Sequence, residues 1–351
     1  MTFLTTAVLA VSLTAVPMPV AAAPETACTV KNDLLAEISG LLADGGGYVV
    51  VNDGADDPDG RKIFFLNKKC KVTDRISYPS RPRDTEDLGR SPDGTIWVGD
   101  IGDNNRDRET VGLWRLKPGE KEPALFRLSY PDGAHDAEAL LVGSDGVPVI
   151  VTKDPLTAGV YLPTGPLDAD TPTPLRRAGD FSIPITTTGN PYGFKGRLVV
   201  TGGAVSADGR RIALRTYADA FEFDVPEGQT DAEGLVKTIS GGTARTVALP
   251  DEPQGESIAY SADGTALLTI SEMADGLTKV DLLTHPLQDT PAEVKGTTTA
   301  PEKSTDPPAE AASKPASNER ELPTGALLAG GALAVAAGLI VLVSARMRRR
   351  R

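Results

Sequence analysis

Carboxylate side chains recur in pairs two residues apart along this sequence. The pairs, one of which has an amide in place of a carboxylate, are Asp84 with Glu86, Asp136 with Glu138, and Gln254 with Glu256. Residues two apart in a β-strand point to the same side of the sheet, so each pair presents its polar groups to one face. Carboxylates crowded together repel one another unless a cation or a basic side chain lies among them. Because the ligand atoms are all oxygens, the pattern favours Ca²⁺ over zinc.

A second set of polar residues ends the second strand of each of five repeated units, which are described below. These residues are Asp53, Asp100, Lys153, Arg215 and Glu272. Beside them, Asp103 and Asn104 lie in a glycine-bearing loop that could ligate a cation or hold a polar ligand. The sequence therefore predicts a metal site drawn from Asp84, Glu86, Asp100, Asp103, Asp136, Glu138 and Glu256. The ligand-binding candidates are Lys153, Arg215, Asn104 and His135, the first two for an anionic group.

The sequence does not assign catalytic residues. His135 adjoins the acidic pair at Asp136, but no nucleophile is placed beside it, and we interpret it as a loop residue. The motifs of common serine hydrolases, zinc peptidases and phosphate-binding loops do not occur in the sequence. These motifs therefore do not decide whether the protein is an enzyme.

The acidic pairs belong to an internal repeat. Five anchor positions, at residues 37, 86, 138, 201 and 256, are 49, 52, 63 and 55 residues apart, and each is followed seven residues later by Asp-Gly. This spacing is typical of propeller blades and too long for paired-helix repeats of about 34 residues. Most units contain four β-rich runs separated by turn residues. We predict an all-β propeller of about five four-stranded blades over residues 28–287, or six if residues 156–197 conceal another.

The two cysteines bear on how such a ring closes. The last unit lacks an obvious fourth strand, and residues 26–30 offer one unattached strand. Pairing the two would cover an exposed edge. Cys28 would then lie on the closing strand and Cys70 at the start of an outer strand of the first unit. In an oxidising compartment, this placement predicts a disulfide between them.

Both ends of the chain are predicted to lie outside the propeller. Residues 1–22 are uncharged, largely apolar and end in small residues, as a secretory signal does. Residues 288–325 are rich in Pro, Thr and Ala, which favours an extended stalk. Residues 326–345 are uncharged and long enough to cross about 30 Å of hydrocarbon. The arginines of the tail, residues 346–351, place it in the cytoplasm, so we expect a single-pass cell-membrane protein with an extracellular propeller.

The segment before the predicted span resembles a cell-wall sorting signal. It reads Leu322-Pro323-Thr324-Gly325 and lacks the residue that sortase motifs carry between Pro and Thr. We therefore expect a retained membrane anchor rather than covalent attachment to the wall.

The net charge of the chain limits the classes of partner that it is expected to bind. The chain has 36 basic and 48 acidic residues, and without the five arginines of the tail its net charge is about −17. Nucleic acid is excluded as a partner on this basis, because its binding depends on neutralising phosphates with Lys and Arg. Besides the membrane, the expected partners are cations, the cell wall or an anionic small molecule.

Several segments resemble actinobacterial exported propellers of the phytase-like family, also described as having the esterase-like activity of phytase. They are residues 84–104, HDAEAL from His135, VTK from Val151, VTGGAVSADGRR from Val200, LRTY from Leu214 and QGESIAY from Gln254. The resemblance covers roughly residues 37–272 and implies a propeller. The β-propeller phytases use calcium in a carboxylate-lined channel, so the resemblance also implies Ca²⁺ here. Ala204 stands where relatives often carry an acidic residue, which would leave the ring incomplete.

Together these observations predict a surface-anchored binding or interaction module whose acidic channel holds a divalent cation. A calcium-dependent phosphoesterase or esterase-like hydrolase is one alternative, in which Lys153 and Arg215 orient an anionic ester. A wall-associated structural platform is the other. Fold alone does not decide among them, because propellers carry many unrelated functions.

Overall fold

The computed structural model describes residues 23–55, 57–273 and 276–287, all within one unit that spans residues 1–290. The predicted signal, stalk, membrane span and cytoplasmic tail lie outside these residues. Within the described part of the chain, no helix is long and apolar enough to cross a membrane.

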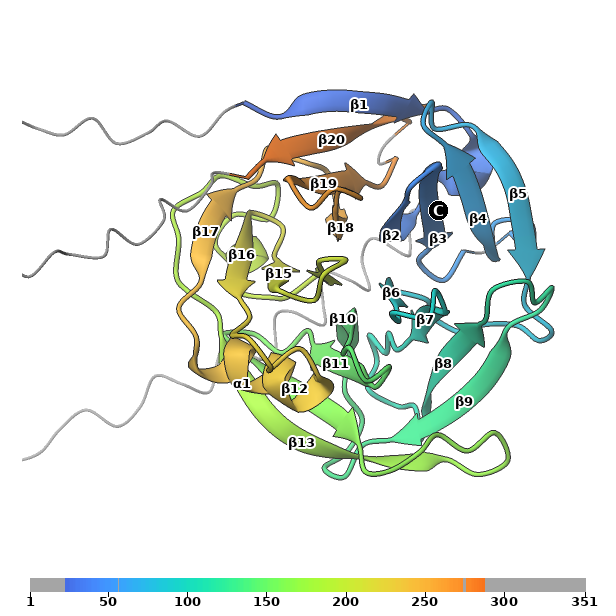
Figure 1. The fold of residues 1–351 in the computed structure, drawn as a ribbon. Coiled ribbons are helices and arrows are strands. Elements are labelled where there is room, and N and C mark those ends of the chain that lie inside the picture. The colour runs from blue at the N-terminus through green and yellow to red at the C-terminus, as the bar shows by residue number, and fades with distance from the viewer. Residues whose placement is uncertain (1–22, 56, 274–275, 288–351) are drawn as a thin grey trace, which may run out of the picture. The chain divides into compact units, whose positions relative to one another are not determined.

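Four-stranded antiparallel groups surround a central axis (Figure 1). From the axis outward, the first group contains β2 (Ile38–Asp44), β3 (Gly47–Asn52), β4 (Lys62–Asn67) and β5 (Val72–Ser77). The second contains β6 (Asp87–Arg90), β7 (Ile96–Asp100), β8 (Val111–Leu116) and β9 (Ala124–Ser129). The third contains β10 (Ala137–Val142), β11 (Pro148–Thr152), β12 (Thr157–Pro163) and β13 (Thr173–Ser182).

The remaining strands continue this arrangement. The fourth group contains β14 (Gly202–Val205), β15 (Arg211–Arg215), β16 (Asp219–Asp224) and β17 (Arg245–Ala248). The last contains β18 (Gly255–Tyr260), β19 (Ala266–Ser271), β20 (Val280–Pro286) and β1 (Glu25–Val30). A short parallel pairing of β13 with β9 joins the second and third groups into one eight-stranded sheet. The described residues are therefore nearly all β and form a propeller-like ring.

Burial on both faces explains why the inner strands are so apolar. In β3, Val49, Val50 and Val51 are all almost fully buried. Successive side chains of a strand point to opposite faces, so each inner strand packs against the groups on both sides. β-Branched residues suit such positions because they fit closely on a pleated surface. The apolar core thus lies between neighbouring groups and leaves the axis to polar side chains.

The ring is closed by its own first strand, as the sequence predicts. β1 pairs antiparallel with β20, so the N-terminal strand completes the last group. Cys28 in β1 and Cys70, just before β5, form a disulfide with their Cα atoms 5.7 Å apart. The predicted disulfide is confirmed, and it joins the last group to the first. Residues 23–287 therefore contain every strand that the closed ring uses.

Removing the disulfide should weaken this closure. We expect the Cys28→Ser, Cys70→Ser double variant of fragment 23–287 to lose about 2–4 kcal/mol of unfolding free energy, because the bridge constrains the unfolded chain. Urea unfolding of the two proteins measures the difference. A loss below about 1 kcal/mol would show that pairing of β1 with β20 suffices for closure.

The stretch 156–197, in which the six-blade alternative required another blade, supplies β12 and β13 and no further four-stranded sheet among the described residues. One local feature differs from the sequence-based expectations. A helix that the strand pattern did not predict, α1 (Ala232–Gly241), follows the fourth group's third strand. Asp231, which resembles the first residue of an acidic pair, caps α1 by accepting a hydrogen bond from the Gly234 N–H at 2.9 Å.

Candidate cation-binding site

A bulge near the start of each inner strand sets the direction of one side chain. In β10 and β18 the pairing register shifts at Glu138 and Glu256, and in β2 it shifts at Ser39. In the second group, the Glu86 N–H donates to the Gly99 carbonyl, although Gly99 is already the pairing partner of Asp87. Such bulges turn side chains away from the regular alternation of a strand. The five equivalent residues are Ser39, Glu86, Glu138, Thr201 and Glu256.

This comparison corrects the anchor of the first unit. Ser39, not Glu37, occupies the position of the other groups' glutamates. The Glu37 carbonyl instead accepts a hydrogen bond from the Asp53 N–H, as the Asp136 carbonyl does from Lys153. The first hairpin turns directly after Asp44, so counting seven residues back from Asp-Gly ends two residues too early.

A second ring of residues follows the second strand of each group. Its members are Asp53, Ile101, Lys153, Tyr217 and Glu272. The sequence alignment placed Asp100 and Arg215 here, one and two residues too early. The turn of the fourth group is one residue longer, which accounts for one of its two residues of offset: the Ser206 N–H bonds to the Arg211 carbonyl, whereas the Gly143 N–H bonds to the Val147 carbonyl. Tyr217 therefore takes the position that was expected to carry a positive charge.

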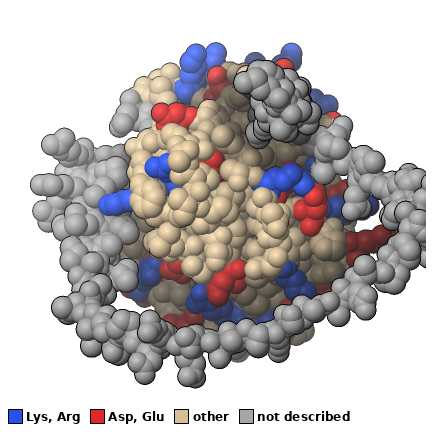
Figure 2. Space-filling view, turned by 90° about the vertical axis from the view of Figure 1, so that its left-hand side faces the viewer, with Lys and Arg blue, Asp and Glu red and all other residues tan. Residues whose placement is uncertain are grey.

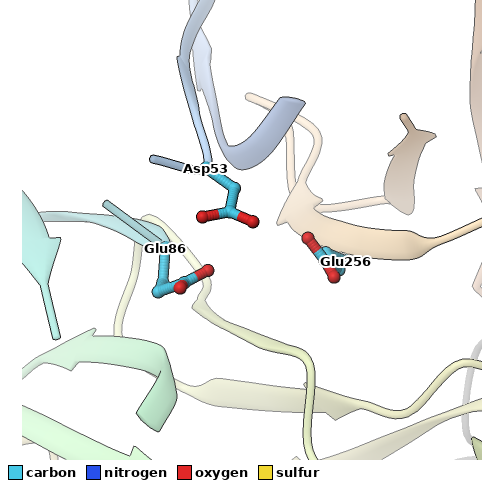
Figure 3. Close-up of side chains that lie close together, drawn as sticks. All are labelled: Asp53, Glu86 and Glu256. Carbon is cyan, nitrogen blue, oxygen red and sulfur yellow. The ribbon is translucent and has the colours of Figure 1, made fainter. Parts of the chain in front are cut away.

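Three carboxylates converge where these two rings meet. One carboxylate oxygen each from Asp53, Glu86 and Glu256 lies within 4.8 Å of the others. Figure 3 shows the three side chains pointing toward one another from separate segments of the first, second and last groups. Glu86 is 1% exposed and Glu256 is 3% exposed. We refer to Asp53, Glu86 and Glu256 as the carboxylate cluster.

Burial and mutual repulsion favour the protonated forms of the cluster. Burial raises the pKa of Glu86 well above its usual value, and the charges of Asp53 and Glu138 raise it further. Burial, with the charge of Asp84, does the same to the pKa of Asp53. The pKa of Glu256 rises from 4.5 to about 7, through burial and then the charge of Glu272. A cation would remove the repulsion and restore the charged forms.

The cluster contains an acceptor that the described protein atoms do not satisfy. Tyr217 Oη donates a hydrogen bond to Glu256 Oε1 at 3.2 Å. The other oxygen, Glu256 Oε2, is buried and has no hydrogen-bond partner among the described residues. A buried carboxylate oxygen without a donor is costly, so this atom is available to a ligand.

The loop after β7 packs directly on the cluster and requires glycine to do so. A Cβ atom at Gly102 would lie 2.0 Å from Glu86 Oε1 and 2.8 Å from Asp84 Oδ2. Any other residue would displace these carboxylates. Asp84 itself receives a side-chain hydrogen bond from Asp53, which lowers its pKa and partly offsets the rise caused by burial. The predicted residue Asp84 thus adjoins the cluster.

Lys153 is directed at a different carboxylate. Its Nζ forms an ion pair with Glu138 Oε1 and lies 5.8 Å from the centre of the Tyr217 ring. Burial alone would lower the pKa of Lys153, but the charges of Glu138, Tyr217 and Glu256 outweigh it, and the pKa is raised well above its usual value. Glu138 therefore has a counter-ion, whereas Glu256 in the cluster is influenced by the more distant charges of Lys153 and Arg215.

Two predicted metal ligands instead support the loop after β7. Asp100 is fully buried and accepts hydrogen bonds from Arg108 Nη2 at 2.9 Å and Trp114 Nε1 at 3.2 Å. Asp103 accepts one from the Arg108 N–H at 2.9 Å, and its own N–H donates to Asp136 Oδ1 at 2.8 Å. These contacts direct Asp100 and Asp103 at protein donors. Asn104, on the same loop, is exposed.

Arg215 and His135 also have protein partners. Arg215 is fully buried and donates to the Ser257 carbonyl at 2.8 Å and to Glu252 Oε2 at 3.1 Å. This placement leaves its predicted ligand-binding role without support. His135 Nε2 lies 3.1 Å from Asp132 Oδ1, and its Nδ1 lies 3.3 Å from Asp154 Oδ2. His135 thus connects the loop before β10 to the loop after β11.

Sequence reasoning missed Asp87, the residue next to Glu86. Its carboxylate is fully buried and accepts hydrogen bonds from the N–H groups of Leu140 at 2.8 Å, Gly203 at 3.1 Å and Leu88 at 2.8 Å. Burial raises its pKa well above the usual value, although these three bonds oppose the rise. Asp87 thereby links the inner strands β6, β10 and β14. The sequence signal that could have identified Asp87 is an acidic residue inside an otherwise apolar strand.

Comparison with known proteins gives similarity to solved structures at low sequence identity. No family model matches the sequence, and no curated protein matches it. The structure is similar to that of virginiamycin B lyase from Staphylococcus aureus, with 13% identity, a TM-score of 0.35 and coverage of 71% of this chain and 66% of the lyase. It is also similar to the WD40 repeats of RRP9, with 11% identity, a TM-score of 0.34 and coverage of 71% and 67%. The chain therefore spans slightly under two thirds of the lyase's length.

Proposed function

We propose that this protein is an exported, membrane-anchored binding module, a propeller of five blades that holds Ca²⁺ at the carboxylate cluster. The convergence of Asp53, Glu86 and Glu256 carries this proposal, because one oxygen of each lies within 4.8 Å of the others. The phytase-like resemblance supports calcium. Each four-stranded group is taken as one blade.

The dimensions of the cluster suit calcium. Ca²⁺ binds oxygens at about 2.3–2.6 Å, so two ligands on opposite sides of the ion are about 5 Å apart. Mg²⁺ requires shorter bonds in a near-ideal octahedron, and zinc prefers nitrogen and sulfur ligands. Three carboxylates leave positions for water or for a bound partner. The nearby carboxylates of Asp84 and Glu272 add to the negative potential at the ion.

Calcium titration of fragment 23–287 by calorimetry tests the proposal. We expect one Ca²⁺ per chain, and affinities at least about tenfold weaker for Asp53→Asn, Glu86→Gln and Glu256→Gln, because each loses one charged ligand. Asp263→Asn is the matched control, because Asp263 lies in an exposed turn at the opposite end of the strands. Absence of binding at millimolar Ca²⁺ would contradict the proposal.

The observed contacts favour binding over hydrolysis. In the hydrolase alternative, Lys153 and Arg215 would orient an anionic ester, but Lys153 pairs with Glu138 and Arg215 with Glu252. The structural-platform alternative differs from the proposal in needing no cation. A screen of phosphomonoesters and carboxylesters with calcium-loaded protein tests the hydrolase alternative. Turnover that Glu256→Gln abolishes would favour hydrolysis.

Anchoring is a separate part of the proposal. It depends on the apolar, uncharged segments 1–22 and 326–345 and on the arginines that follow the second. Protease added to intact cells should release a soluble propeller by cutting within residues 288–325. A propeller that stays protected until the cells are opened would reverse the proposed topology.

A further inference from the structure

A cleft lies at the end of the strands opposite the carboxylate cluster, between the turn that joins β6 to β7 and the turn that joins β10 to β11. These turns span residues 91–95 and 143–147. The cleft has a volume of about 350 Å³, and the residues that line it include Pro92, Asp93, Trp97, Arg115, Lys117 and Asp145. Its volume is within the range of sites that bind small molecules. We refer to it as the turn cleft.

Arg115 lines the turn cleft without a counter-ion. It lies on β8, with its guanidinium carbon 4.6 Å from the centre of the Phe126 ring and 5.9 Å from the centre of the Trp97 ring. Among the described residues, its side chain forms no hydrogen bond or ion pair, and its Nε is buried without a partner. A carboxylate matches the planar fork of a guanidinium. Arg115 can therefore bind an anionic group without giving up a protein partner.

Trp97 anchors the turn cleft to the core. Its ring is 6% exposed and belongs to the apolar core between the second and third groups. The ring Nε1 donates a hydrogen bond to Ser91 Oγ at 2.8 Å, which fixes the first turn. The two turns also lie close together, because a Cβ atom at Gly146 would be 3.8 Å from Ser91 Oγ. The lining is therefore formed before a ligand binds, which lowers the entropic cost of binding.

The two aspartates of the turn cleft supply acceptors. Asp93 Oδ1 accepts a hydrogen bond from the Thr95 N–H at 3.0 Å. Asp145 Oδ1 accepts one from the Val147 N–H at 3.2 Å. The hydrogen bonds from Thr95 and the charge of Lys117 lower the pKa of Asp93, so its carboxylate is ionised at neutral pH. A carboxylate has about four acceptor sites, so both exposed aspartates can also accept from hydroxyl groups of a ligand.

Opposite charges meet in the turn cleft. Arg115 and Lys117 are opposed by Asp93 and Asp145, so the lining has no net charge. The outer side of the ring differs in this respect. Figure 2 views that side from β17 and α1 and shows a broad uncharged area with charges mainly at its margins. The close mixture of donors and acceptors in the turn cleft is therefore not shared by that side of the ring.

We propose that the turn cleft binds an acidic sugar, a ring that carries several hydroxyl groups and one carboxylate. The carboxylate binds Arg115, hydroxyl groups donate to Asp93 and Asp145, and the ring lies beside Trp97. The turn cleft shares no residue with the carboxylate cluster. The inference therefore goes beyond the proposed function and does not require calcium.

The lining favours this ligand over simpler ones. A sulfate ion has no hydroxyl donor, so the carboxylates of Asp93 and Asp145 would repel it. A neutral sugar would leave Arg115 unpaired, which costs affinity. An acidic sugar supplies the anion and the hydroxyl donors together, so it satisfies all three side chains.

Calorimetric titration of fragment 23–287 in EDTA tests this inference with glucuronate, glucose and acetate. Glucose lacks the carboxylate of glucuronate, and acetate lacks its hydroxyl groups. We expect glucuronate to bind at least about tenfold more tightly than either, because it alone satisfies both Arg115 and the aspartates. Equal binding of glucuronate and acetate, or of glucuronate and glucose, would overturn the inference. Absence of glucuronate binding in the millimolar range would do so as well.

Arg115→Met is the test variant, because methionine keeps an unbranched apolar chain against Phe126 and Trp97. It should lower the affinity for glucuronate at least about tenfold. Arg210→Met is the matched control, because Arg210 is exposed in the corresponding turn of the fourth group and does not line the cleft. Equal losses in the two variants would overturn the inference. Arg115→Lys keeps the charge without the planar fork and should lose part of the affinity, and the comparison of probes on the unchanged protein depends on no variant.

Calcium titration separates this inference from the proposed function. Glu86→Gln, which should lose calcium, should bind glucuronate as the unchanged protein does. Calcium binding without discrimination among the three probes would overturn the inference and leave the cation site intact. Selective glucuronate binding by a protein that binds no calcium would support the inference and contradict the cation site. Glucuronate binding that EDTA abolishes would place the carboxylate on calcium and overturn the inference.

Discussion

Replacing Glu256 by Gln should stabilise the propeller by about 3 kcal/mol near pH 7.5 in the absence of divalent cations. The pKa of Glu256 is raised from 4.5 to about 7, so the folded protein holds its proton more tightly than the unfolded chain. Its contribution to stability is fully present below about pH 4.5 and is lost as pH rises through about 7. Asp53 and Glu86 change in the same direction. The unchanged protein should therefore be less stable at neutral pH than near pH 5.

Calcium should reverse this loss. Saturating Ca²⁺ near pH 7.5 stabilises the folded state by about 2.7 kcal/mol at 100 times the dissociation constant. Near pH 5 Glu256, with its pKa of about 7, is protonated, so the same calcium concentration should have a smaller effect. Urea unfolding at both pH values, with and without calcium, measures all four free energies.

His285 affects the pH dependence of both proteins equally, and Glu222 provides a control variant for this experiment. Burial, with the charge of Arg215, lowers the pKa of His285 to about 4, so its contribution to stability is lost as pH falls from about 6.5 to 4. This opposing effect is the same in both proteins and cancels in their comparison. Glu222 is also buried but pairs with Arg245 at 3.0 Å, so Glu222→Gln should destabilise at neutral pH. If Glu256→Gln destabilises equally at both pH values, the repulsion argument is wrong.

Removing the Asp87 carboxylate should have an even larger effect on folding. We expect Asp87→Ala to cost about 4 kcal/mol or more, because each buried N–H that loses its acceptor costs about 1–3 kcal/mol. The affected donors are Leu88, Leu140 and Gly203, on β6, β10 and β14. Thermal unfolding of fragment 23–287 measures the change.

Asp87→Asn provides the matched control. Its amide oxygen can still accept from Leu140 and Gly203, which both bond to Asp87 Oδ2. The asparagine variant should therefore retain more stability than the alanine variant. Equal losses would show that the carboxylate charge, rather than its bonds to three strands, is what the ring requires.

The sequence revealed the ring well because its signals are local and repeated. Asp-Gly turns, β-rich runs and blade-sized spacing indicate a propeller without knowledge of long-range contacts. The unattached strand at residues 26–30 and the positions of Cys28 and Cys70 were sufficient to predict closure. Helix α1 was missed because it interrupts a unit whose four strands were already accounted for.

The site was harder to predict from the sequence than the ring, because its geometry depends on offsets of one residue between the aligned units. Glu86 and Glu256 were predicted as ligands, and the structure brings them together. Asp53 was noticed as a strand end but not as a ligand, since strand pairing, not spacing, places it beside them. A turn longer by one residue accounts for half of the two-residue offset between Arg215 and Tyr217. Bulges likewise cannot be read from a period of two.

A crystal structure of fragment 23–287 grown with Ca²⁺ would show whether the carboxylate cluster binds calcium. We predict an anomalous peak bonded to oxygens of Asp53, Glu86 and Glu256 at about 2.3–2.6 Å, and its loss in Glu86→Gln crystals. A calcium-soaked structure in which these carboxylates bond only to water or to one another would contradict the claim.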